Sequence, residues 1–289
     1  MTLPKISQNG PILMVIASFI FSLMSVLIKY LGKDIPCMEI IFFRSISSLT
    51  ILMVLVLIFQ THLLSGQYKF LILRGVSSFC AFTIFYYAIT QMHLARVSVI
   101  MQTRPFIVLV LAYFFLKEKL SGKEFWVLMV SFPGVLFMLK SEHSQLGIDF
   151  VSLICLLGVI FAALSAVIVK YVTATIPTIC ILFYFMLVSS VCSLPLTMND
   201  FVLPDLNQTF VLVLIGVLST FAQLLMTEAI RFSKTTIVAL VGYIGVVFSS
   251  IWELLFWNAL PDLDTIIGGI IIGIAVVFLA IQKKRSQSP

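Results

Sequence analysis

Long apolar runs almost free of charged residues recur along the whole chain and leave few folds open. A run of about 20 apolar residues is what a helix needs to cross the hydrocarbon core of a bilayer. Strands of a membrane barrel would instead alternate polar and apolar residues over about ten positions, and these runs show no such alternation. The runs cover residues 11–31, 36–60, 70–91, 95–116, 125–139, 150–172, 179–196, 209–230, 235–257 and 265–281. The sequence therefore predicts an all-α integral membrane protein with ten transmembrane helices.

The composition supports lipid as the main solvent. Only 10% of the 289 residues are charged and 61% are hydrophobic, whereas soluble domains carry about 25% charged residues. The net charge of +6 is spread over short loops, so a basic patch for nucleic acid is not expected. The partners that we expect are the lipid bilayer and a small-molecule substrate, bound by a monomer or a homodimer.

Neither an active site nor a metal site is visible. The five cysteines stand alone, without a C-x-x-C pair, and the three histidines fall between the apolar runs. A membrane enzyme or a zinc site would need such groups clustered. We therefore expect no enzyme, no cofactor and no metal.

Positive charges predict the orientation, because lysine and arginine concentrate in cytoplasmic loops. With the N-terminus inside, twelve of these residues lie at inner ends, among them Lys69, Arg74 and Lys170, and four lie at outer ends. An even number of crossings then places both termini in the cytoplasm. The expected location is the cell inner membrane, as a multi-pass protein.

The chain resembles itself at an offset of 141 residues. The segment 26–36 resembles 167–177, and both contain a Lys-Tyr pair and an Ile-Pro pair. We therefore expect two five-helix repeats, at residues 1–145 and 146–289. Because five is odd, the second repeat enters the membrane from the opposite side, and inverted repeats of this kind build transporters with a site between them.

Several short motifs stand out along the chain: Lys29-Tyr30, Phe42-Phe43-Arg44-Ser45, Leu73-Arg74-Gly75, Arg104-Pro105-Phe106, Phe115-Leu116-Lys117-Glu118 and Gly242-Tyr243-Ile244-Gly245. Together they resemble the drug/metabolite transporter superfamily, specifically its EamA-type members with ten helices. The resemblance covers nearly the whole chain and implies two five-helix repeats and metabolite transport. One departure is Asn258, which stands where family members often place a glutamate.

Two arginines within the spans are candidates for substrate binding. Arg44 lies in the second span and Arg104 near the middle of the fourth. Charged groups at mid-membrane depth cost several kcal/mol and usually face a bundle interior or a wet cavity, and a guanidinium fits carboxylate or phosphate. The alternative is structural, with each arginine paired to a carbonyl or to a glutamate, which for Arg44 is the nearby Glu39.

The fourth and ninth spans supply the proposed centre of the site. Pro105 removes a backbone donor and bends its helix, next to Gln102, while Gly242, Tyr243 and Gly245 lie at the same depth in the second repeat. We predict Gln102 and Tyr243 as substrate-binding residues, and Pro105 and the two glycines as hinges. The alternative is ordinary close packing by small residues.

Four further polar residues are candidates for the cavity wall or for proton coupling. Tyr87 and Gln223 occupy the third and eighth spans and are candidates for the cavity wall, although tyrosines also face lipid or core. Glu228 and Glu253 are candidates for proton coupling. Each carboxylate also has a structural alternative at the membrane interface, which for Glu228 is a pair with Arg231.

These observations predict a secondary transporter that moves a small polar or charged metabolite by alternating access. The family resemblance and the arginines favour an amino acid or an amino-acid derivative. The alternatives are uptake of an S-adenosylmethionine-like nucleoside metabolite, drug efflux, and, from other classes, a channel or a membrane scaffold that does not transport. No G-x-x-x-x-G-K-[ST] motif occurs, so ATP is not expected to drive the protein directly.

Overall fold

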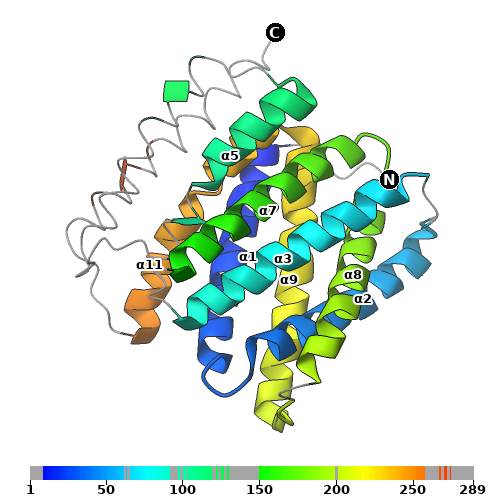
Figure 1. Ribbon diagram of the computed structural model, residues 1–289, viewed down its shortest axis with the longest axis vertical. Helices are drawn as coiled ribbons and strands as arrows, with labels where there is room; N and C mark the ends of the chain where they lie inside the picture. Colours follow the sequence, from blue (N-terminus) through cyan, green and yellow to red (C-terminus); the bar gives the residue numbers. More distant parts are fainter. Residues whose placement is uncertain are drawn as a thin grey trace.

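The computed structural model describes residues 9–61, 63, 66–91, 97, 100, 101, 103–118, 122, 125, 126, 129, 150–198, 201–257, 267, 270, 271 and 274. Within these residues every regular element is helical, and the helices cross one another in a bundle (Figure 1). The expected all-α membrane fold is confirmed, because six described helices are long and apolar enough to cross a membrane.

The helix bounds agree with the apolar runs to within three residues at six spans. The helices are α1 (Gly10–Leu31), α2 (Cys37–Phe59), α3 (Tyr68–Gln91), α5 (Arg104–Leu111) with a π-helical turn at Ala112–Leu116, α7 (Phe150–Val172), α8 (Thr178–Thr197), α9 (Leu206–Phe232), α10 (Thr235–Val241) and α11 (Ile244–Trp257). The runs 125–139 and 265–281 lie mostly outside the described residues. The total of ten helices and their grouping into two repeats therefore stay predictions.

Local chemistry sets where several helices begin and end. Pro36 and Pro177 stand directly before α2 and α8, because proline tolerates the position where no helical N–H bond is needed. The Asp205 side chain accepts from the Gln208 N–H (2.6 Å) and the Gln208 side chain accepts from the Asp205 N–H (2.9 Å), a capping box that begins α9. At the other end of α9, the Lys170 ammonium of α7 donates to the carbonyls of Ile230 (2.9 Å) and Arg231 (3.3 Å).

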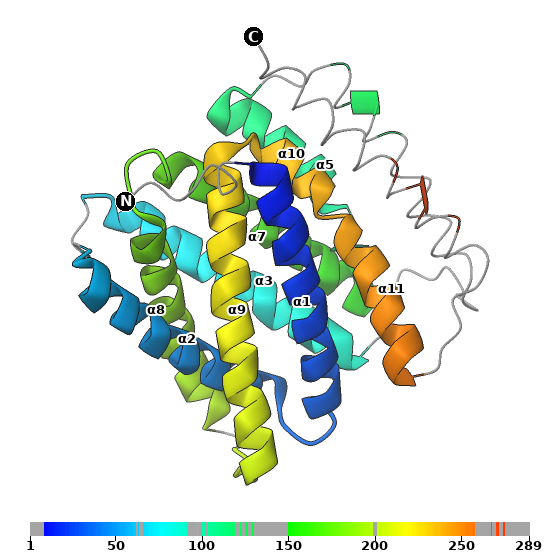
Figure 2. The ribbon, with the colours of Figure 1, turned by 180° about the vertical axis from the view of Figure 1, so that it is seen from behind.

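The closest helix pairs join the two halves of the chain. α1 packs along α9, α3 along α7 and α2 along α8, and Figure 2 shows α1 and α9 side by side. Small residues allow such approaches: Ser45 of α2 and Ser189 of α8 share a hydrogen bond of 2.8 Å, and α2 also contacts α9, where Ser48 donates to the Gly216 carbonyl at 3.0 Å. The interior of the bundle is thus an interface between the N-terminal and C-terminal halves.

Two of the apolar runs are interrupted. In the run 95–116, a turn at Thr103 precedes α5, and Pro105 lies in the first turn of that helix. In the run 235–257, Gly242 and Tyr243 separate α10 from α11, and the Tyr243 N–H bonds to the carbonyl three residues earlier (3.1 Å). Hydrogen bonds of this tighter type mark a local change of helix geometry. Both interruptions occur beside the cavity described next.

Candidate functional site

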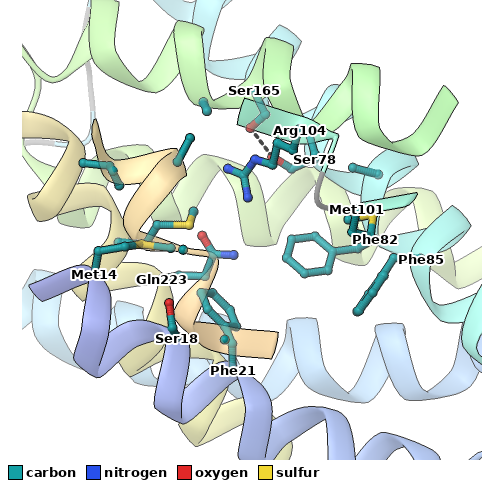
Figure 3. A pocket seen from close by; sticks show the side chains of 18 of the residues that line it. Met14, Ser18, Phe21, Ser78, Phe82, Phe85, Met101, Arg104, Ser165 and Gln223 are labelled. Carbon is teal, nitrogen blue, oxygen red and sulfur yellow. Dashed lines mark hydrogen bonds between the residues drawn. The ribbon is translucent and has the colours of Figure 1, made fainter. Parts of the chain in front are cut away.

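A cavity of about 250 Å³ lies between the two halves of the chain (Figure 3). Its walls come from α1, α3 and α5 of the first half and from α7, α9, α10 and α11 of the second half. Both helix interruptions line it, through Arg104 and Pro105 on one side and through Gly242 on the other.

Arg74 of α3 supplies one positive charge to the cavity wall. Its side chain is 1% exposed to solvent, and its Nη2 donates to the Gln223 Oε1 over a long distance of 3.5 Å. Its Nε and Nη1 are buried without a hydrogen-bond partner. The guanidinium carbon lies 4.2 Å from the centre of the Phe185 ring, a cation–π contact that helps a desolvated arginine to stay buried.

Arg104 supplies a second positive charge. As the first residue of α5, it stands directly after the turn at Thr103. Its guanidinium points into the open space of the cavity, toward the side chain of Gln223 (Figure 3). The Arg104 Nε is buried without a hydrogen-bond partner, so this arginine retains unused donor capacity.

The remaining polar groups at the cavity are uncharged. Because the Gln223 Oε1 accepts from Arg74, its amide nitrogen is the end available to a ligand, and Figure 3 shows this nitrogen facing the cavity. Ser78 of α3 and Ser165 of α7 share a hydrogen bond of 2.6 Å beside Arg104. The Ser18 hydroxyl is buried without a partner.

Methionine and aromatic side chains form the rest of the wall. Phe82 and Phe85 lie together on one side, and Phe21 and Met14 of α1 lie on another (Figure 3). Aromatic faces and thioethers adapt to the apolar part of a small ligand. Few polar groups within a mostly apolar concavity are typical of small-molecule sites.

No carboxylate lines this cavity among the residues that the structure describes. Glu118 instead accepts from the Thr235 N–H at 3.3 Å. The Glu228 carboxylate accepts from Arg231 at 3.1 Å and from the Thr178 hydroxyl. The described wall of the cavity therefore carries two positive charges and no negative one.

The residues predicted from the sequence divide into three groups. Those that line the cavity are Arg104, Gln223, Pro105, Gly242 and Gly245. Those that the structure places elsewhere are Arg44, Tyr87, Tyr243 and Glu228. Gln102 and the side chain of Glu253 lie outside the described part of the chain.

The residues placed elsewhere have identifiable surroundings. Tyr243 is 1% exposed and belongs to the main apolar cluster, whereas Tyr87 is 42% exposed. Arg44 is fully buried and donates to the Tyr86 hydroxyl at 3.3 Å. The structural alternative of a pair with Glu39 is not what the structure shows, because Arg44 bonds to Tyr86 and the Glu39 carboxylate accepts from the Val202 N–H at 3.1 Å.

Sequence reasoning assigned Arg74 the wrong place. Counted with Lys69 as a positive charge at an inner membrane end, it is in fact buried at the cavity wall. A usable signal is its position inside the apolar run 70–91, and in the structure it lies six residues into α3, which begins at Tyr68. Nearly two helical turns separate it from the helix end, too far for a side chain that only marks the interface.

Comparison with known proteins adds four findings. A model described as the EamA-like transporter family matches residues 8–140 and, again, 150–281. The pseudopaline exporter CntI of Pseudomonas aeruginosa is 36% identical over 280 residues, which cover 96% of this chain and 98% of the relative. The S-adenosylmethionine uptake transporter of Rickettsia prowazekii is 28% identical over 285 residues, covering 98% and 96%. A solved crystal structure shares the fold with a TM-score of 0.80 at 12% identity, over 96% of this chain and 98% of that one.

Proposed function

Because the chain belongs to the EamA-like transporter family, we propose that its cavity carries an anionic or zwitterionic metabolite, an amino acid or amino-acid derivative, across the membrane. The resemblance drawn from the sequence motifs is thereby confirmed. The family and both relatives named above are transporters of small metabolites rather than enzymes. The substrate class and the transport mechanism are what we propose for this chain.

One observation carries the substrate class: Arg74 and Arg104 line the same cavity, and no described carboxylate faces them. An anion that leaves water loses its hydration, and guanidinium donors replace those lost hydrogen bonds with charge-assisted ones. Arg74 and Arg104 still have unpaired buried nitrogens. A carboxylate would satisfy these donors, whereas a cation would meet two like charges.

Alternating access is supported by the division of the cavity wall between the two halves. The family model matches the chain twice, at 8–140 and 150–281, and the closest helix pairs each join one half to the other. We propose that residues 1–145 and 146–289 are inverted repeats that rock against each other. We expect the two helices to bend at their interruptions, at Thr103 and Gly242, during this movement.

A second candidate substrate is an amino acid that bears a nucleoside. The relative named as an S-adenosylmethionine uptake transporter favours it. In the cavity, its carboxylate would meet Arg104 while its base packed against Phe82 or Phe85, since aromatic pairs prefer stacked or edge-to-face contact. The positive sulfonium argues for the first candidate, because the described wall offers it no carboxylate.

Counterflow in proteoliposomes tests the proposal. Vesicles containing the purified protein are loaded with one unlabelled compound and diluted into the same labelled compound. We expect saturable, transient accumulation for amino-acid derivatives that carry a free carboxylate, and much weaker accumulation for their amides. Accumulation of amines or amides in preference to carboxylates would contradict the substrate class, and uptake without saturation would indicate a channel.

A further inference from the structure

Arg44 of α2 is a fully buried charge that lies outside the cavity. One hydrogen bond, from its Nη1 to the Tyr86 hydroxyl, holds it at 3.3 Å. Its Nε and Nη2 are buried without partners. No acidic residue pairs with it in the part of the chain that the structure describes.

Aromatic rings stand around the Arg44 guanidinium. Its central carbon lies 4.3 Å from the centre of the Phe82 ring and 5.7 Å from the centres of the Tyr86 and Phe185 rings. Such cation–π contacts are strongest when the cation is desolvated. They stabilise the burial of the charge but do not neutralise it.

One of these rings, Phe82, lies between Arg44 and the cavity, because Phe82 lines the cavity and Arg44 does not. Phe82 lines the cavity, and its ring stacks on Phe185 with centres 5.9 Å apart and planes inclined by 26°. Phe185 also carries the Arg74 guanidinium at 4.2 Å. A ligand atom that touches Phe82 would lie roughly 8 Å from Arg44, because a van der Waals contact adds about 3.5 to 4.0 Å.

We propose that Arg44 determines anion specificity from behind Phe82, by adding a third positive charge to the electrostatic potential inside the cavity. The proposal rests on the proposed function of the cavity. In a buried, water-poor region, a charge at this distance is little screened by salt and still acts strongly on a second charge. Arg44 therefore acts on the ligand through its electric field and does not touch it.

If Arg44 acts through its charge, the loss of binding on its replacement depends on the charge of the ligand. A role in packing alone would not produce this dependence. A suitable series is N-acetylaspartate with two negative charges, N-acetylasparagine with one, and N-acetylasparagine amide with none. Each added charge interacts once with Arg44. Removing that arginine should weaken binding by about tenfold per charge, which corresponds to about 1.4 kcal/mol, and should leave the neutral amide unchanged.

The experiment measures the dissociation constants of these three probes on the purified, full-length protein. Arg44→Gln removes the charge and keeps a polar side chain at this position. We expect about tenfold weaker binding of N-acetylasparagine and about a hundredfold weaker binding of N-acetylaspartate. Arg44→Lys restores the charge and should bring both values back to within about threefold of the original protein.

A uniform loss across the three probes, or no loss, would overturn the inference, since both results assign Arg44 to packing alone. Arg44→Met is a second neutral variant of similar length and must give the same charge dependence. Tyr86→Phe removes the hydroxyl partner but leaves the charge, so it should retain the original series. If neither acid binds to the unaltered protein, the proposed function of the cavity fails instead, and the two failures remain distinguishable.

Discussion

Two interrupted helices line the cavity, and each contributes a different property to its wall. The interruption in the first half brings Arg104 and Pro105 to the wall, and the interruption in the second half brings Gly242 and Gly245. At the offset of 141 residues, Gly245 stands where the first half has Arg104. At the interruptions, the first half therefore supplies positive charge to the cavity, and the second half supplies space.

The difference shows that similar backbone geometry does not imply similar chemistry. A Cβ atom on Gly242 would lie 3.1 Å from the Met14 methyl carbon, so the absence of a side chain allows α1 to approach closely. On Gly245 the nearest atom, in Ser18, would be 3.7 Å away, which is an ordinary contact. Only one of the two glycines is thus required by packing, and an anion would be held mainly by the first half.

The largest effect is expected from removing the charge of Arg104 at the first interruption. Arg104→Gln should lower kcat/KM for an anionic substrate about tenfold to a hundredfold, because a hydrogen bond to a charged group contributes about 1.5 to 3 kcal/mol. The measurement is initial uptake into proteoliposomes. Lys33→Gln is the matched control, since it removes the same charge from an exposed position and should leave uptake unchanged. Equal uptake by both variants would remove Arg104 from the site.

A negative charge introduced at Gln223 should also lower the uptake of anions. Gln223→Glu would pair with Arg74 and cancel one of the two positive charges of the wall, so uptake of anions should fall by about tenfold. Gln208→Glu makes the same chemical change in the exposed capping box of α9, which accepts glutamate equally well. Retained uptake by Gln223→Glu would show that the anion does not approach α9.

A smaller effect is expected where the second interruption supplies space. Gly242→Val would press on Met14 and on the carbonyl of Ala239, 3.1 Å from the added Cβ. Overpacking of this kind costs about 1 kcal/mol, so transport should fall about fivefold for every substrate, irrespective of its charge. A loss confined to anions would contradict the assignment of Gly242 to space rather than to charge.

Gly245→Ala should have the smallest effect. Its added methyl group would meet only Ser18, at an ordinary distance, and alanine is a better helix former than glycine in α11. We expect transport within about twofold of the original protein and an unchanged or slightly higher Tm. A strong defect would show that the movement of the helices needs glycine at this position.

The sequence predicted the helices well because membrane spans obey a simple rule of length and polarity. The runs 11–31 and 150–172 reappear almost unchanged as α1 and α7. The break at Gly242 could be located only as a small-residue segment, since its geometry depends on Met14 of another helix.

The site was harder to predict than the fold because a span does not reveal which side of a helix faces the cavity. Arg44 and Arg104 are the same residue type within apolar runs, yet only Arg104 lines the cavity. Arg74 was read as an interfacial charge because it follows Lys69 closely in sequence. Distinguishing such residues requires the packing of α3 against α7 and α8, which pairs residues far apart in the chain.

Cysteine modification measures the sign of the electrostatic potential inside the cavity, on which the proposed substrate class depends. In a variant with its five free cysteines replaced by alanine, Ser249→Cys places a single thiol at the cavity wall. Its reaction rates with a sulfonate-bearing and with a trimethylammonium-bearing methanethiosulfonate are compared after division by the rates for a small free thiol. The anionic reagent should be favoured about tenfold, and Arg104→Gln should reduce this preference. A faster reaction with the cationic reagent would contradict the account.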